Sequence, residues 1–160
     1  MSQRITDENV LRAAQQQMLG LKTKNTLSDS SADTVLLHLV KMRASQINGC
    51  AYCLAMHARE LRESGEREDR IYVLDAWRET SWFTDRERAA LAWTEAVTIL
   101  PNNEVPDTVF ERARAQFSEQ ELADLTLIAI AINGWNRINI AFRNQPVPFM
   151  IESNQAVAAH

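Results

Sequence analysis

Glycine and proline are scarce in this chain, with four of each among 160 residues, and this scarcity narrows the possible folds. Both residues interrupt regular helices, so the long stretches between them can form continuous helices. Within those stretches apolar residues recur three and four positions apart, and few strand-like alternations are present. The sequence therefore predicts an all-α fold, a bundle of about six or seven helices.

Capping and stop signals mark the expected helices. Two S/T-x-x-E boxes, from Thr84 to Glu87 and from Ser118 to Glu121, are typical of helix starts. Seven helices are expected, over residues 7–20, 32–47, 50–64, 69–79, 84–100, 106–117 and 118–141, with a polar connector at 22–30 and an irregular tail from residue 144. We expect one domain spanning residues 1–160, because a chain of this length can bury a core of its own.

The charge pattern argues against a nucleic-acid partner. The net charge is −4, and between residues 59 and 70 arginines alternate with glutamates, Glu60 among them, which is typical of a solvated helix face. The first nine residues lack the apolar region of a secretory signal, and the most apolar run, 125–132, is too short to span a bilayer. We therefore expect a cytoplasmic protein with no membrane partner.

The two cysteines of the chain form a C-x-x-C pair, Cys50 and Cys53, and His57 follows four residues later. Positions three, four and seven apart share a helix face, so a helix beginning near Cys50 would align all three side chains. The turn signal Asn48-Gly49 places Cys50 at the helix N-terminus, where unpaired N–H groups and the helix dipole favour a thiolate. A protonated His57 would lower the pKa of Cys53 as well.

Three interpretations of this cluster are open. A redox dithiol would attack a peroxide, form a sulfenic acid and close to a disulfide, with His57 as proton carrier; the spacing does not decide which cysteine attacks. A zinc site would use Cys50, Cys53, His57 and, from the preceding helix, His38. In the third interpretation, these side chains only pack a helical interface. In a reducing cytosol, a C-x-x-C pair favours redox or metal chemistry over a structural disulfide.

The segment from Leu39 to Cys53, with Met56-His57 after it, resembles the core of the alkylhydroperoxidase AhpD-like family, within the carboxymuconolactone decarboxylase-like superfamily. The similarity centres on the pattern S-Q-x-N-G-C-x-Y-C-x-x-x-H and extends over about residues 35–143. Further matching segments are Trp77 to Glu79, Phe83, Glu87 to Leu91, Glu95 to Thr98, Trp135 to Ile138 and Ala141 to Arg143. The resemblance implies an all-α homo-oligomer, a trimer or a hexamer.

The resemblance also implies a role for each residue of the cluster. Cys53 would be the peroxidatic cysteine, Cys50 the resolving cysteine and His57 a member of a proton relay. The chain departs from the family at His38, where a glutamate twelve residues before the first cysteine commonly completes the relay. A histidine there can carry a proton, but it brings no negative charge to orient His57, and two imidazoles oppose each other's protonation. Tyr52 stands between the cysteines, where the best-known peroxidases have a histidine.

The leading hypothesis is a thiol-dependent peroxidase that reduces hydrogen peroxide or an organic hydroperoxide through the Cys50/Cys53 dithiol. It expects no cofactor and no metal, and it requires a thiol or protein electron donor. The main alternative is a non-enzymatic oligomeric protein that senses oxidant or holds zinc with the same residues. A decarboxylase-like lactone enzyme, as elsewhere in the superfamily, ranks below both, because the sequence has no evident cationic carboxylate-binding cluster.

Overall fold

The computed structural model describes residues 31–148, with side chains from Thr34 onward, and these residues form helices and turns without a β-strand. The elements are α2 (Ser31–Asn48), α3 (Ala51–Glu63), α4 (Glu68–Val73), η2 (Leu74–Glu79), α5 (Asp85–Ile99), η3 (Pro101–Asn103), α6 (Asp107–Arg114) and α7 (Glu119–Phe142), where η denotes a 3-10 helix. The predicted all-α fold is confirmed. The helix expected over 7–20 and the connector at 22–30 lie outside the described residues.

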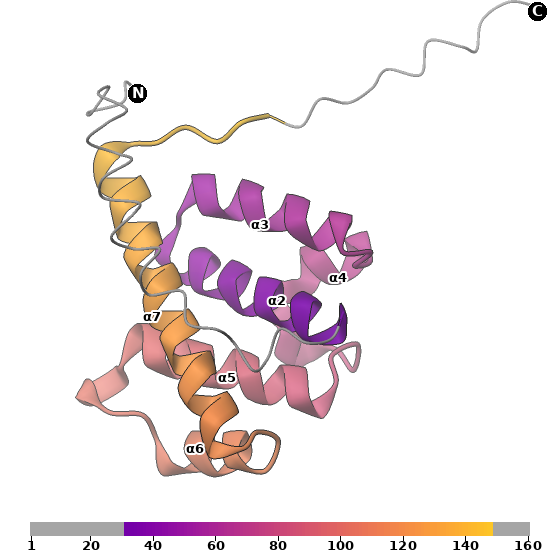
Figure 1. Ribbon diagram of the computed structural model, residues 1–160, viewed down its shortest axis with the longest axis vertical. Helices are drawn as coiled ribbons and strands as arrows, with labels where there is room; N and C mark the ends of the chain where they lie inside the picture. The colour runs from indigo at the N-terminus through magenta and orange to yellow at the C-terminus, as the bar shows by residue number, and fades with distance from the viewer. Residues whose placement is uncertain (1–30, 149–160) are drawn as a thin grey trace, which may run out of the picture.

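Helix α2 is the centre of the bundle, with α3 on one side and α5 on the other, while α7 packs against all three (Figure 1). Its apolar residues point in two directions. Leu36 and Val40 join the core formed with α5, α6 and α7, whereas Leu39 and Met42 join a second core formed with α3, η2 and α5. Each fully buried aliphatic side chain contributes about 2 kcal/mol relative to exposure, so α2 holds both halves of the fold together.

The turn at Asn48-Gly49 ends α2 and starts α3, as predicted. Gly49 has φ +69°, in the left-handed region where residues with a Cβ are strained. Cys50 then takes an extended backbone conformation and caps α3, because its Sγ accepts a hydrogen bond from the Cys53 N–H at 3.3 Å. The helix also stops as predicted, since Gly65 follows it with φ +80°.

Both predicted capping boxes are present. The side chains of Thr84 and Ser118 accept hydrogen bonds from the backbone N–H groups of Glu87 and Glu121, and each glutamate carboxylate accepts one from the N–H of its cap. These reciprocal bonds satisfy two N–H groups that would otherwise lack a partner at the start of each helix. The starts of α5 and α7 are therefore fixed by local sequence.

The single helix expected over 69–79 is replaced by α4 and η2. Ala76 leaves the helical region, with φ −106° and ψ 28°. Arg88 of α5 donates hydrogen bonds to the carbonyls of Trp77 and Thr80 at 3.1 and 2.8 Å, so both carbonyls have a side-chain partner. A contact with α5 thus accompanies the break in the helical pattern here.

The long apolar helix α7 is buried along one face. Leu125 and Ile132 lie in the core, whereas Ile130 and Ile140 are 47% and 46% exposed. The trimer or hexamer expected from the family resemblance stays a prediction.

No helix within residues 31–148 is long and apolar enough to cross a membrane. The cytoplasmic location also stays a prediction.

A buried carboxylate, Glu95 of α5, connects η2 with α2. Its side chain accepts from Arg43 Nε at 2.7 Å and Trp77 Nε1 at 2.9 Å, and it pairs with Arg78 Nη2 at 2.6 Å. Burial acts to raise the pKa of Glu95, but these three donors hold it below its usual range. The charge of Glu95 is therefore fully compensated inside the fold.

Replacing Glu95 by alanine should lower the free energy of unfolding by about 3 kcal/mol, because two arginines lose their common partner in a largely buried site. Urea unfolding followed by circular dichroism measures this change. The control is Asp69→Ala, which removes the exposed partner of Arg67 and should leave the unfolding midpoint unchanged. A loss at Glu95 below about 1 kcal/mol would show that this network contributes no more than a surface ion pair.

Candidate active site

The two thiols lie where α2, α3 and α7 meet. Cys50 and Cys53 are free cysteines with 1% and 0% of their surface exposed. They pack with Ala44 of α2 and Ile132 of α7, and the partly buried Tyr52 and Trp135 lie against this cluster. The predicted dithiol at the start of a helix is therefore present, with Cys50 as the capping residue and Cys53 one turn further in.

Amide side chains of α7 face the dithiol. Asn139 Nδ2 donates a hydrogen bond to Cys53 Sγ at 3.4 Å, and Asn139 Oδ1 accepts one from Asn144 Nδ2 at 2.7 Å. Asn136 is fully buried and donates to Ser45 Oγ at 3.0 Å. An N–H donor aimed at a sulfur stabilises its thiolate form, so α7 favours negative charge on Cys53.

Asn139 is a site residue that sequence reasoning missed. The available signal was the spacing of Asn133, Asn136 and Asn139, three residues apart on a helix that is otherwise largely apolar. Such a polar stripe predicts a shared face. It does not show that this face meets α3, because the contact joins residues 86 positions apart.

The hydrogen bonds of the dithiol separate the acidities of the two cysteines. The bond from the Cys50 thiol lowers the pKa of Cys53 to about 7, and the amides of Asn136 and Asn139 act in the same direction, against the effect of burial. The bond with Cys53, together with burial, raises the pKa of Cys50 well above its ordinary value. The geometry thus favours Cys53 as thiolate and Cys50 as thiol, a choice that the spacing alone left open.

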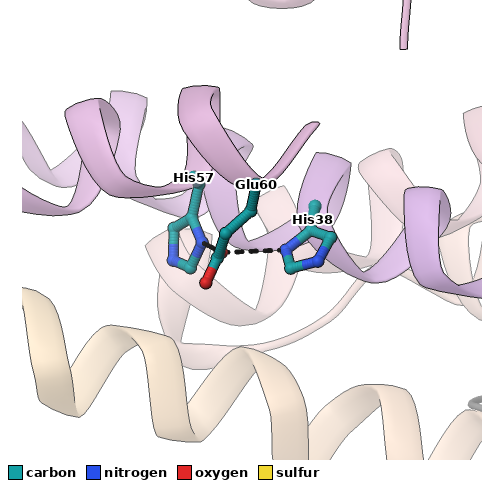
Figure 2. A group of neighbouring side chains, drawn as sticks. All are labelled: His38, His57 and Glu60. Carbon is teal, nitrogen blue, oxygen red and sulfur yellow. Dashed lines mark hydrogen bonds and ion pairs between the residues drawn. The ribbon is translucent and has the colours of Figure 1, made fainter. Parts of the chain in front are cut away.

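Glu60 is the second candidate site residue that sequence reasoning missed. Its carboxylate lies between two imidazoles (Figure 2), with Oε2 at 2.6 Å from His57 Nδ1 and 3.0 Å from His38 Nδ1. His57 and Glu60 are three residues apart on α3 and so share a face, while His38 reaches them from α2. The sequence assigned Glu60 to a solvated face, and this assignment is wrong: its side chain is only 35% exposed. The His-x-x-Glu spacing was the available signal.

The negative charge that the sequence lacks at position 38 is supplied instead from α3. His38 does face the site, with its ring centroid 6.1 Å from that of His57. Burial acts to raise the pKa of Glu60, but the two imidazoles hold it far below its usual range. The carboxylate therefore stays ionised and can orient His57.

His57 is buried and neutral. Because Nδ1 donates to Glu60, the lone pair lies on Nε2, which is buried and has no hydrogen-bond partner among the described residues. Burial lowers the pKa of His57, and the nearby Lys41 and His38 lower it further. The Glu60 carboxylate acts in the opposite direction and offsets part of this decrease. His57 is therefore a base on the same face of α3 as Cys53, whereas a protonated His57, which the sequence offered as one way to lower the pKa of Cys53, is disfavoured by burial.

Three side chains within residues 34–148 converge in a way that suits a metal ion. They are His38, His57 and Glu60, and one ligand atom from each lies within 4.8 Å of the others. Cys50 and Cys53 do not belong to this group. The described structure thus does not gather the four-residue zinc set that was one interpretation of the sequence.

A cavity of about 420 Å³ lies away from the dithiol, between η2, α5 and α6. Arg78, Arg88 and Arg112 line it, whereas none of the cysteine or histidine residues of the site does. This gathering of cations was not evident in the sequence. Arg78 already pairs with Glu95, and Arg88 already binds backbone carbonyls, so neither is available as an open anion-binding group.

The ultraviolet absorbance of thiolate should rise with a midpoint near pH 7 in the reduced protein, because Cys53 loses its proton as the pH passes its pKa of about 7. The Cys53→Ser variant should lack this transition. A midpoint near the ordinary thiol value of about 8.5 would contradict the stabilised thiolate.

Leucine is similar in size to asparagine but has no N–H donor. The Asn139→Leu variant should therefore move the midpoint upward, towards the pKa of an ordinary thiol, because the Cys53 thiolate loses a hydrogen bond. Asn133→Leu is the matched control. Asn133 lies on the same helix but bonds Thr98 and Asn48 rather than a sulfur, and its loss should leave the midpoint in place. Equal shifts in both variants would mean that the effect comes from general loosening of α7.

Comparison with known proteins agrees with this architecture. The model of the carboxymuconolactone decarboxylase family matches residues 12–96. The uncharacterized protein YdfG of Bacillus subtilis (strain 168) is 40% identical over 145 residues, which cover 91% of this chain and 97% of that protein. The uncharacterized protein YnjA of Escherichia coli (strain K12) is 31% identical over 112 residues, which cover 70% of this chain and 61% of that protein.

Solved structures show the same fold. A protein of unknown function from Agrobacterium tumefaciens, described as a candidate antioxidant defence protein AhpD, superimposes with a TM-score of 0.82 and 38% identity over 92% of this chain and 100% of that chain. A peroxidase-related protein with an AhpD core from Ralstonia eutropha JMP134 gives a TM-score of 0.69 and 19% identity over 88% and 72% of the two chains. The chain therefore belongs to the carboxymuconolactone decarboxylase family and has an AhpD-like fold.

Proposed function

We propose that this protein is a thiol-dependent peroxidase that reduces hydrogen peroxide or an organic hydroperoxide with the Cys50/Cys53 dithiol. One observation carries the proposal: α3 holds a stabilised thiolate at Cys53 and, four residues later, a neutral imidazole at His57 that Glu60 orients. This is a nucleophile with its base on one helix face. The likeness to a candidate antioxidant defence protein supports the same reaction.

In the first step Cys53 attacks the peroxide. His57 Nε2 accepts the thiol proton, directly or through a water, and the resulting imidazolium is stabilised by the Glu60 carboxylate. The thiolate then attacks one peroxide oxygen, so an S–O bond forms as the O–O bond breaks. The departing alkoxide or hydroxide takes the proton back from His57. The products are an alcohol or water and the Cys53 sulfenic acid.

In the second step Cys50 resolves this intermediate. Its sulfur attacks the sulfur of Cys53, the S–S bond forms, and the hydroxyl of the sulfenic acid leaves as water with the Cys50 proton. Cys50 is suited to this role because its raised pKa keeps it protonated while Cys53 reacts. Two thiol groups of an electron donor then reduce the disulfide, so each turnover consumes one hydroperoxide and two thiols.

Access to the sulfur is the physical constraint on this reaction. Both sulfur atoms are closed off from solvent, and Tyr52 and Trp135 pack against their cluster. A hydroperoxide therefore reaches Cys53 only when neighbouring side chains move. The burial also has a chemical use, because exclusion of water strengthens the hydrogen bonds that hold the thiolate.

Intact-protein mass spectrometry on the reduced, metal-free protein tests the proposal. One equivalent of hydrogen peroxide or cumene hydroperoxide should remove two hydrogens from the wild type. It should add one oxygen to Cys50→Ser, which forms the sulfenic acid but lacks the resolving thiol, and leave Cys53→Ser unchanged. An unchanged mass of the wild-type protein would contradict the proposed peroxidase reaction. Disulfide formation without continuing turnover in excess thiol would support the redox-sensor alternative.

A Glu60→Gln variant tests the positioning role of the carboxylate in the same assay. Oxidation of Cys53 should slow by about 100-fold, and its pH profile should change, because His57 loses the charge that orients it. Glu63→Gln removes an exposed carboxylate one turn further along α3 and should react at the wild-type rate. Equal rates in the two variants would remove Glu60 from the mechanism.

A further inference from the structure

The group of His38, His57 and Glu60 has a feature that the proton relay does not use. His57 Nδ1 makes an aligned hydrogen bond to Glu60 Oε2 at 2.6 Å, but His38 Nδ1, at 3.0 Å from the same oxygen, is buried without an aligned hydrogen bond. A buried nitrogen that faces a carboxylate without an aligned bond is costly. A ligand between the three side chains would satisfy it.

We propose that His38, His57 and Glu60 form a binding site for a divalent first-row transition-metal ion such as Zn²⁺. The two imidazole Nδ1 atoms lie at 2.6 and 3.0 Å from one carboxylate oxygen, and one ligand atom from each of the three residues lies within 4.8 Å of the others. Two imidazoles and one carboxylate suit zinc, iron or copper better than magnesium or calcium, which prefer oxygen ligands.

The spacing of the ligand atoms fits such an ion after a small movement. With metal–ligand bonds of about 2.1 Å, neighbouring ligand atoms lie about 3.0 Å apart in octahedral and about 3.4 Å apart in tetrahedral coordination. His38 Nδ1 and Glu60 Oε2 are 3.0 Å apart, and the 2.6 Å contact of His57 must widen by about 0.4 Å for octahedral and about 0.8 Å for tetrahedral coordination. Glu60 can make this movement because its side chain is partly exposed, which also leaves room for water ligands.

Metal binding would change the chemistry of His57. A neutral imidazole that binds a metal through Nδ1 carries its proton on Nε2, so Nε2 becomes a hydrogen-bond donor and no longer accepts a proton. The ion also takes Glu60 away from its role as orienting group. If the proposed peroxidase reaction is correct, Zn²⁺ therefore inhibits the oxidation of Cys53, and the metal site regulates the dithiol.

The test measures Zn²⁺ affinity without any activity readout. A chromophoric chelator competes for Zn²⁺ with the full-length Cys50→Ser/Cys53→Ser protein, in which thiols cannot contribute ligands. His38→Gln and Glu60→Gln, made in this background, should each weaken binding by about 100-fold or more, since loss of even an outer partner of a metal ligand weakens affinity by about 10- to 100-fold. Excess Mg²⁺ should not compete.

Matched controls separate this site from nonspecific binding. The variants His160→Ala and Glu63→Gln remove the remaining histidine and a nearby carboxylate, and both should bind Zn²⁺ as the parent does. Thermal melts of the metal-free variants verify that each one is folded. Absence of binding in the cysteine-free protein, or binding that survives both glutamine variants, would overturn the site.

A separate measurement distinguishes the metal site from the proposed reaction. Zn²⁺ added to the wild type should slow peroxide-driven disulfide formation in proportion to the occupancy of the site. If Zn²⁺ binds as predicted while the metal-free wild type never reacts with peroxide, the result supports the metal site and contradicts the proposed peroxidase reaction. Full oxidation rates at saturating Zn²⁺ would overturn the regulatory role.

Discussion

The contact between the Glu60 carboxylate and the His57 imidazole determines what the site can do. The Glu60 carboxylate accepts a hydrogen bond from His57 Nδ1–H, so the buried Nε2 is the only basic nitrogen of that ring. Without this carboxylate the ring could choose either tautomer, and burial alone would leave it an unoriented base. The contact follows from the three-residue spacing of His57 and Glu60 on α3, and α2 packs along α3 and brings His38 to the other side of Glu60 (Figure 2).

Three helices, α2, α3 and α7, each contribute residues to the site around the dithiol. Helix α3 carries the reactive residues in order, with the cap residue Cys50, then Cys53, then His57 and Glu60. Helix α7 contributes the Asn139 amide that bonds the Cys53 sulfur, and α2 contributes His38. Because α2 is also the centre of both hydrophobic cores, the same packing that stabilises the fold holds the site in register.

Sequence reasoning succeeded where the determinants are local. Gly49 in a left-handed turn, the caps at Thr84 and Ser118, and Cys50 at the start of α3 all follow from residues within a few positions of each other. The sequence left open whether His38 faces His57, because this depends on how α2 packs against α3; in the structure the two rings lie 6.1 Å apart.

The His57–Glu60 pair is local and was overlooked, whereas the other missed contacts join distant segments. Glu60 stands among arginines and reads as a solvated residue until α2 packs against it. Asn139 acquires its role only where α7 crosses the dithiol.

The tautomer of His57 is the most direct test of the proposed role of this ring as the base for Cys53. Long-range ¹H–¹⁵N NMR on the reduced, metal-free protein at neutral pH measures which ring nitrogen carries the proton. We predict that Nδ1 carries the proton and Nε2 carries none. This preference for one tautomer should change in the Glu60→Gln variant. A proton on Nε2 in the wild type would contradict the account, because His57 could not then accept the proton of Cys53.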